Sequence, residues 1–316
     1  MLKKFIQRNG HIETILPAIF RKIKFTYHRR DRLALPDGDF IDVDRHVKRN
    51  SKAVVLSHGF EGSSSSHYIL GMADYLSKNG FDIISWNCRG CSGEPNRTLK
   101  FYHAGSSDDL SYVIDQYSDL YEEISLIGFS LGGNLTLKYL GEFPKMVNPK
   151  VISAATFSVP LNLSNGSDQL ERGIGKRIYA PNFLQTLRKK LRERKNELLA
   201  AGVEVEKALK AKTIREFDNL ITAPLHGFGT AKNYYETQSG ANFIEAIDLP
   251  TLIVNSKNDP FLGRKCYPKT ESFQNSLVEI QYPKYGGHVG FVEGDLNSPI
   301  SSELKTLEFF EKNSKI

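Results

Sequence analysis

Residues 125–140, SLIGFSLGGNLTLKYL, decide the fold of this chain. The stretch opens with an apolar run that predicts a strand, passes through a glycine-containing turn, and closes with a helical pattern. The turn, residues 128–132 (GFSLG), matches the pattern G-x-S-x-G. Between a strand and a helix this pattern is typical of a nucleophilic serine rather than of a plain packing turn. We therefore expect Ser130 to be a nucleophile.

The neighbours of Ser130 gain roles from the geometry of such a turn. Gly128 and Gly132 permit the tight backbone, so that the Ser130 hydroxyl projects above the carboxyl edge of a sheet. Leu131 opens the following helix, where its backbone N–H can point at an oxyanion developing on a substrate. The sequence thus predicts Leu131 as one donor of an oxyanion hole.

Short β-branched runs alternate with amphipathic segments around this motif. Such alternation predicts an α/β fold with a mainly parallel central sheet flanked by helices. Upstream, residues 24–46 hold a PDG turn between alternating segments and predict an antiparallel hairpin. The expected strands are 53–57, 82–87, 124–129, 151–157, 251–256 and 277–282, and the expected helices are 68–79, 107–121, 131–143 and 302–312.

The alternation breaks between Pro160 and about Ala246. Within this stretch, residues 183–217 are strongly charged and predicted to be helical, with Leu184, Leu187 and Leu191 on one face. Strand signals return only at Thr251. We expect a helical cap over about 160–246, inserted into a single domain that spans residues 1–316.

A serine of ordinary acidity needs a histidine base, held in turn by a carboxylate. In this kind of fold the acid follows a late strand, and the histidine lies in a loop further on. Asp259 ends the strand in PTLIVNSKNDPF (250–261), and His288 lies among glycines in YPKYGGHVGF (282–291). The predicted triad is therefore Ser130, Asp259 and His288.

Other residues compete for these two roles. His226 lies in the expected cap and His103 precedes a helix; both are more typical of hydrogen-bonding residues that stabilise loops. Asp248 precedes its strand and would face the opposite end of the sheet. Asn258 cannot supply the charge that stabilises an imidazolium.

Residues 56–70, LSHGFEGSSSSHYIL, contain four serines between two histidines. The apolar run before them and the helical pattern after them argue against a flexible linker. The stretch follows an expected sheet strand, so its loop should lie beside Ser130. That position predicts the Phe60 amide as the second oxyanion donor, with His58 and Gly59 supporting the loop. The serines would close the loop and cap the next helix instead of attacking substrate.

The chain has three cysteines, and two of them form CRGC (88–91). C-x-x-C can be a redox or metal half-site, but Cys266 alone does not complete a zinc site and the loop composition after CRGC does not open a helix. We expect no metal and no cofactor. The odd cysteine count and the absence of an apolar signal segment predict a reducing, cytoplasmic location, and ILPAIF (15–20) is too short to span a bilayer.

Formal net charge is +6, and two zones are basic. Residues 187–215 hold ten Lys or Arg and four Glu, and residues 1–30 hold eight Lys or Arg and one Glu. Such zones serve most often as a solvated helix face or arm, and they would also suit peripheral contact with an anionic membrane surface. No nucleic-acid motif or base-stacking aromatic pattern appears, so a nucleic-acid partner is not expected.

The combination of motifs resembles the YheT-like α/β hydrolases, a group similar to vertebrate abhydrolase-domain lipases. The resemblance runs from about residue 10 to 291. It implies the α/β-hydrolase fold and a serine carboxylesterase, with Ser130, Asp259 and His288 at the triad positions. The matching segments are GHIETILPAIFR (10–21), HGFEGSSSSHYI (58–69), NCRGCSGEPNR (87–97), YHAG (102–105), GFSLGGN (128–134), REFDNLITAPLHGF (215–228), NDPF (258–261) and GGHVGF (286–291).

These observations predict a hydrolase of carboxylic esters, either short- to medium-chain acyl esters or lipids, that works through an acyl-enzyme. Its partner would be a small-molecule substrate, and its oligomeric state is left open. Activity should require neutral His288 and fall as the pH drops through roughly 6–7, near the usual pKa of imidazole. A thioesterase or amidase on the same triad, and a non-catalytic binding protein on the same fold, remain alternatives.

Overall fold

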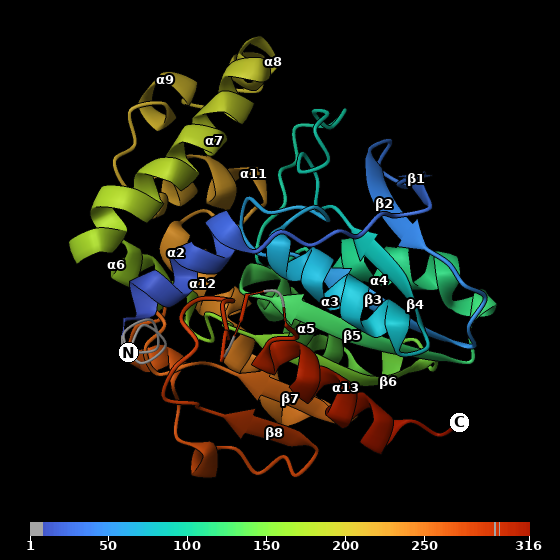
Figure 1. Ribbon diagram of the computed structural model, residues 1–316. Helices are drawn as coiled ribbons and strands as arrows, with labels where there is room; N and C mark the ends of the chain where they lie inside the picture. Colours follow the sequence, from blue (N-terminus) through green and yellow to red (C-terminus); the bar gives the residue numbers. More distant parts are fainter. Residues whose placement is uncertain (1–8, 294, 297) are drawn as a thin grey trace.

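A computed structural model of the chain describes residues 9–293, 295–296 and 298–316. Its centre is an eight-stranded sheet with the order β1-β2-β4-β3-β5-β6-β7-β8 (Figure 1). Strands β3 to β8 are parallel, and β2 is antiparallel to both of its neighbours. The strands are β1 (Arg29–Ala34), β2 (Phe40–His46), β3 (Lys52–Ser57), β4 (Phe81–Trp86), β5 (Glu123–Phe129), β6 (Val151–Phe157), β7 (Thr251–Val254) and β8 (Val278–Gln281).

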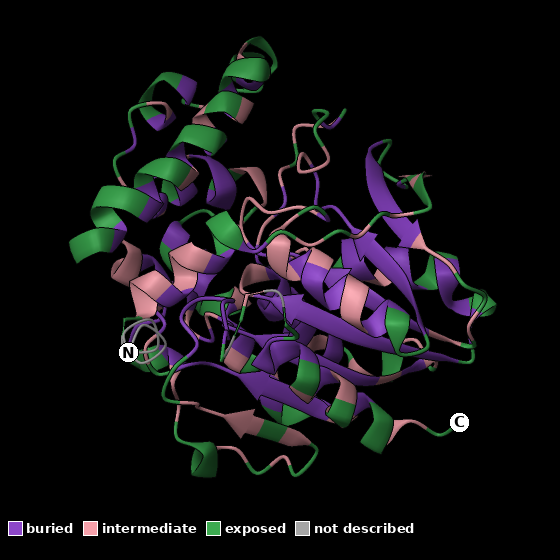
Figure 2. Cartoon of the chain, viewed as in Figure 1, coloured by how far each residue is buried: buried purple, intermediate pink, exposed green. Residues whose placement is uncertain are grey.

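Helices cover both faces of the sheet because successive strand residues point to opposite sides. In β3, Val54 and Leu56 face a core formed with α3 (His67–Lys78) and α13 (Ser301–Asn313). Ala53 and Val55 face a second core, formed with α4 (Ser107–Tyr117) and α5 (Leu131–Glu142). Figure 2 shows the inner strands buried and the edge strand β8 partly open to solvent. The expected mainly parallel sheet and its flanking helices are confirmed.

The N-terminal region differs from the expected basic arm, whose first eight residues lie outside the described part of the chain. Helix α2 (Gly10–Phe20) begins after Asn9, whose side chain accepts hydrogen bonds from the amides of His11 and Ile12. Pro17 lies inside this helix, where proline is normally unfavourable. The arm interpretation was therefore wrong for residues 10–20.

We call residues 160–246, between β6 and β7, the cap segment; they are mainly helical. Leu184, Leu187 and Leu191 are buried in a separate apolar cluster here. The stretch 183–217 is broken into several helices, and Gly202 interrupts it at a positive φ of 78°. The helices of the cap segment are α6 (Leu163–Leu170), α7 (Ala180–Glu193), α8 (Lys195–Ala200), α9 (Val205–Ala208), α10 (Ile214–Phe217), α11 (Ala223–Leu225) and α12 (Ala231–Gln238).

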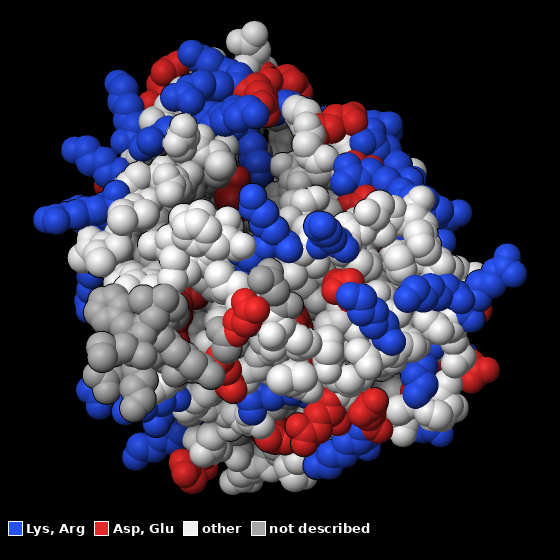
Figure 3. Space-filling view, in the orientation of Figure 1, with Lys and Arg blue, Asp and Glu red and all other residues white. Residues whose placement is uncertain are grey.

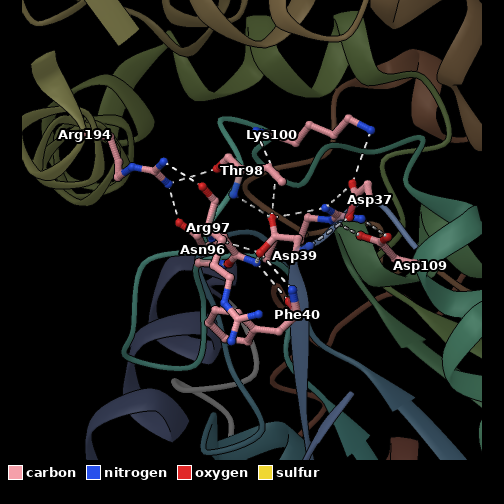
Figure 4. A network of polar contacts seen from close by, with 11 residues as sticks. Asp37, Asp39, Phe40, Asn96, Arg97, Thr98, Lys100, Asp109 and Arg194 are labelled. Atoms are coloured by element: carbon pink, nitrogen blue, oxygen red, sulfur yellow. Dashed lines mark hydrogen bonds and ion pairs between the residues drawn. The ribbon is translucent and has the colours of Figure 1, made fainter. Parts of the chain in front are cut away.

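The loop after β4 fastens the cap segment to the sheet (Figure 4). Buried Asp39, just before β2, accepts hydrogen bonds from the Asn96 side chain and from the Thr98 hydroxyl, both at 2.6 Å. The Arg194 guanidinium, at the end of α7, donates to the carbonyls of Arg97 and Thr98 at 2.9 Å. The loop that opens with CRGC is thus held by carboxylate and guanidinium contacts.

None of the helices within the described residues combines the length and apolar character needed to cross a membrane.

Candidate active site

Ser130 stands on the turn between β5 and α5 with φ +54° and ψ −118°, a conformation that non-glycine residues rarely adopt. Its amide donates to the Phe157 carbonyl at 2.8 Å, which anchors the turn to the neighbouring strand β6. A Cβ on Gly132 would come within 2.4 Å of the Ser57 carbonyl oxygen, so α5 packs against β3 only with glycine there. This close packing holds the serine at the carboxyl edge of the sheet.

The structure brings together the three residues that the sequence predicted for the triad. Ser130 Oγ lies 3.0 Å from His288 Nε2. His288 Nδ1 lies 2.9 Å from Asp259 Oδ2 and 3.1 Å from Asp259 Oδ1. His288 and Asp259 are buried, and the Phe261 ring stacks on the imidazole at 4.0 Å. This arrangement can pass a proton from the hydroxyl to the imidazole while the carboxylate stabilises the resulting charge.

Helix α2 holds the loop that carries His288, a role that sequence reasoning missed. The His288 amide donates to Thr14 Oγ1 at 2.9 Å. Buried Glu13 accepts hydrogen bonds from the Gly286 amide and the Asn258 side chain, and its burial raises the pKa of its carboxyl. Asn258, excluded as the acid, thus contributes as a bridge between α2 and this loop. The only available signal was the match of residues 10–21 to the resembled family.

The loop after β3 lies beside Ser130 because β3 and β5 are adjacent, with Ser57 opposite Gly128. The Gly59 amide donates to the Tyr68 hydroxyl at 3.0 Å, and the Glu61 amide donates to the Tyr102 hydroxyl at 2.6 Å. The intervening Phe60 amide donates to no residue that the structure describes, and the same holds for the Leu131 amide. Both predicted oxyanion donors therefore have an N–H group without an acceptor among the described residues.

His58 holds this loop and is not a rival base. Its Nε2 accepts a hydrogen bond from the Cys88 amide at 3.0 Å, so Nδ1 carries the proton and donates to the Gly59 carbonyl at 2.7 Å. Burial lowers the pKa of His58 to about 4, which keeps the ring neutral. The expected supporting position of His58 and Gly59 agrees with these contacts.

The four serines stabilise the loop and the entry to α3, but the expected capping bond is absent. Ser66 occupies the N-cap position, yet its side chain makes no capping hydrogen bond to α3 and instead accepts one from the Ser63 amide at 3.0 Å. The Ser64 hydroxyl donates to Asp44. The prediction of a serine side-chain cap was wrong because the loop itself uses that hydroxyl.

A buried ion pair links the loop after β3 to the cap segment. Lys190 of α7 lies 2.7 Å from the Glu61 carboxylate, and the Tyr102 hydroxyl donates to the same carboxylate at 3.0 Å. Cys91 Sγ lies 3.5 Å from Lys190 Nζ. Burial raises the pKa of Cys91 to about 12 and also raises the pKa of Cys88, so neither thiol forms a reactive thiolate readily.

The rival histidines, His103 and His226, lie next to each other. The rings of His103 and His226 are 4.3 Å apart, and His103 Nδ1 accepts a hydrogen bond from the Gly105 amide. Burial lowers the pKa of His103 to about 2 and that of His226 to about 4. The Ser130 hydroxyl contacts His288 instead.

A cavity of about 990 Å³ reaches Ser130 and His288. Most of its walls come from α2, the loop after β3 with the start of α3, and the cap segment, and residues 101–103, 130–131, 261–262 and 288–289 also contribute. The lining is mostly apolar and includes Ile15 and Ala18 of α2 and Phe183, Leu187 and Phe217 of the cap segment. The space is large enough for an extended apolar ligand.

Three comparisons with known proteins all find hydrolases. A family model described as alpha/beta hydrolase fold matches residues 52–295. The chain is 37% identical over 301 residues to the putative esterase YheT of Escherichia coli (strain K12), across 92% of this chain and 86% of that protein. It is 30% identical to phospholipase ABHD3 of Bos taurus, across 89% of this chain and 71% of that protein. The solved structure of the Pyrococcus furiosus esterase PF2001 shares the fold, with a TM-score of 0.60, 15% identity and 91% coverage of both chains.

Proposed function

The chain belongs to the α/β-hydrolase family, in its YheT-like group, and from this premise we propose that it cleaves carboxylic esters with Ser130, His288 and Asp259. The observation that carries the proposal is the continuous contact from the Ser130 hydroxyl through His288 to the Asp259 carboxylate, at 3.0 and 2.9 Å. These distances suit proton transfer at the nucleophile and an oriented base.

The reaction has two halves. The Ser130 Oγ attacks the ester carbonyl while His288 Nε2 takes its proton, and the intermediate collapses when His288 returns that proton to the departing alcohol. A water molecule then gives its proton to His288 and attacks the acyl-serine, and His288 returns the proton to Ser130 as the acid is released. Asp259 keeps the proton of the neutral imidazole on Nδ1 and stabilises the imidazolium in both halves.

The amides of Phe60 and Leu131 are the proposed oxyanion donors. Two observations support this role: both amides lie beside Ser130, and neither donates to a described residue. One such donor typically contributes about 2.7–4 kcal/mol to transition-state stabilisation.

We propose a small-molecule ester or a lipid as substrate, with acyl chains of short to medium length included. The large apolar cavity supports an acyl-binding role, and the relatives named esterase and phospholipase support an ester bond. The cap segment is proposed to cover the site within one domain, since Phe183 and Leu187 share the cavity with Ser130. The triad would also accept a thioester or an amide.

The decisive experiment compares the wild type with Ser130→Ala on a chain-length series of p-nitrophenyl esters, with fluorophosphonate labelling in parallel. We expect the wild type to be labelled, and we expect the variant to escape labelling and to lose roughly 10⁴-fold or more in kcat. Equal hydrolysis by both forms would remove Ser130 from the mechanism. Neither turnover nor labelling of the wild type would favour the non-catalytic binding protein. Thioesters and amides of the same acyl chains, assayed alongside, identify the preferred bond.

A further inference from the structure

Two large apolar side chains line the cavity and also reach solvent, so they mark its mouth. Ile19 of α2 is 59% exposed, and Ile178 of the turn Gly175–Tyr179 is 44% exposed. Phe20, next to Ile19, is 58% exposed, and Ile174, four residues before Ile178, is 41% exposed. We call these four residues the apolar rim. Large aliphatic and aromatic side chains gathered around a cavity entrance are typical of an interaction surface.

Cations without partners accompany the apolar rim. Lys22 and Lys24 follow α2, and Arg172, Lys176 and Arg177 surround Ile174 and Ile178. All five are exposed, and none forms an ion pair within the part of the chain that the structure describes. Figure 3 shows an area with few charged side chains over α2 and the adjoining cap segment, with Lys and Arg at its sides and some Asp or Glu below it.

The basic zone at 187–215 differs from the rim because most of its cations are neutralised. The ion pairs are Lys189–Glu193, Lys190–Glu61, Arg194–Glu197, Lys195–Glu206, Lys207–Glu204 and Arg215–Asp168. Within the described residues, the five cations near the cavity mouth are thus without ion pairs, whereas six of the ten cations in 187–215 are paired; Arg192, Lys210 and Lys212 of that zone are exposed and form no ion pair there.

We propose that the apolar rim docks onto an anionic lipid surface, with Lys22, Lys24, Arg172, Lys176 and Arg177 contacting the headgroups. Ile and Phe side chains enter the boundary between headgroups and acyl chains, while basic residues are attracted to the negative surface potential. The mouth of the cavity then faces the lipid, so an acyl chain can reach Ser130 without crossing water. Docking itself depends only on this surface; the delivery of an ester rests on the proposed function.

Vesicle co-sedimentation tests the docking. The full chain is mixed with vesicles of phosphatidylcholine plus phosphatidylglycerol, or of phosphatidylcholine alone. We expect clear preference for the anionic vesicles, and about 25-fold or greater weakening by Lys176→Glu/Arg177→Glu, since each basic residue contributes roughly fivefold at such a surface. Phe20→Ser/Ile174→Ser should remove the part of binding that survives high salt. The four substituted residues, Phe20, Ile174, Lys176 and Arg177, do not line the cavity.

A matched control uses the opposite edge of the sheet. Phe143 and Met146 are exposed beside Lys145, ahead of β6 at its amino end. Lys145→Glu/Met146→Ser should bind vesicles as the wild type does. Equal weakening by this control, rim variants that bind like the wild type, or wild-type binding that ignores lipid charge would each overturn the proposal. No vesicle binding at all would do so too, and would point to an acidic protein partner.

Two further measurements separate docking from catalysis. All surface variants should hydrolyse a dissolved p-nitrophenyl ester at the wild-type rate if the ester-cleaving function is correct. Ser130→Ala should sediment with anionic vesicles as the wild type does, even if no ester is ever cleaved. Loss of its vesicle binding would count against a docking surface independent of the site.

Discussion

Ser130 keeps a backbone conformation that most residues avoid, and its surroundings make this tolerable. The Phe157 carbonyl accepts its amide hydrogen, and Gly132 allows α5 to approach β3 closely. This strained conformation places Ser130 at the cavity described above. At the residue scale, the proposed chemistry therefore depends on a few backbone contacts around one side chain.

Asp259→Asn tests the role proposed for the carboxylate. The amide removes the charge that stabilises imidazolium and favours the wrong tautomer of His288, so kcat should fall by roughly 10⁴-fold. Initial rates with a short p-nitrophenyl ester measure the loss. Asp248→Asn is the control, because Asp248 is exposed and precedes β7 at the other end of the sheet. Similar rates for both variants would contradict the assignment of Asp259.

At the scale of elements, the site is assembled by segments distant in sequence. Helix α2 supports the loop of His288 through Thr14 and Glu13. Helix α7 contacts the loop after β3 through Lys190, whose partner Glu61 follows Phe60. Neither helix carries a residue of the proposed triad. Both helices restrict the loops that carry Phe60 and His288, and so they restrict the positions of the atoms proposed to react.

Lys190→Met tests the ion pair between α7 and the loop after β3. The Glu61 side chain is 4% exposed and that of Lys190 17%, so the substitution leaves a buried carboxylate without its cation. We expect a loss of about 3 kcal/mol in the free energy of unfolding, at the low end for buried pairs because Lys190 keeps some exposure. A lower kcat should accompany it, since Glu61 adjoins the Phe60 amide.

The double variant Lys190→Met/Glu61→Gln is the control for this pair. It removes the unpaired charge and should recover a large part of the lost stability. Urea unfolding of the wild type, both single variants and the double variant gives the coupling energy. Additive effects of the two substitutions would show that the ion pair does not connect the two elements.

At the scale of the whole molecule, burial of several histidines makes stability depend on pH. Burial lowers the pKa of His58, His67 and His226 to about 4 and that of His103 to about 2, below the usual histidine pKa of about 6.5. The unfolded chain therefore binds more protons than the folded chain between pH 6.5 and 4. Burial also raises the pKa of Asp218 to about 6 and raises the pKa of Glu13, Glu171 and Glu303; these carboxyls act in the opposite direction and offset part of the histidine effect.

We expect the free energy of unfolding to be fully developed above pH 6.5 and to fall by several kcal/mol as the pH drops towards 4. Denaturant unfolding at a series of pH values measures this. His67→Phe should reduce the slope by about one proton, because this buried ring no longer titrates in the unfolded chain. A flat stability profile in the wild type would refute the burial argument.

The predicted strands agree with the observed strands to within about two residues, since β-branched runs and their flanking turns are local signals. Helix α2 was missed because Pro17 argues locally against a helix, while the packing of α2 on the His288 loop is a tertiary contact. The breaks within 183–217 escaped notice because charged, helix-favouring residues continue across them.

Sequence alone determined the α/β-hydrolase class, the turn that carries Ser130, and the choice of Asp259 and His288, because each depends on short motifs and on chain order. The catalytic roles of these residues stay predictions until variants are assayed. Tertiary structure alone decided that Thr14, Glu13, Glu61 and Lys190 adjoin the site, and that five cations with no ion pair to a described residue lie near the cavity mouth. These features join segments far apart in the chain, and only packing brings such segments within contact distance.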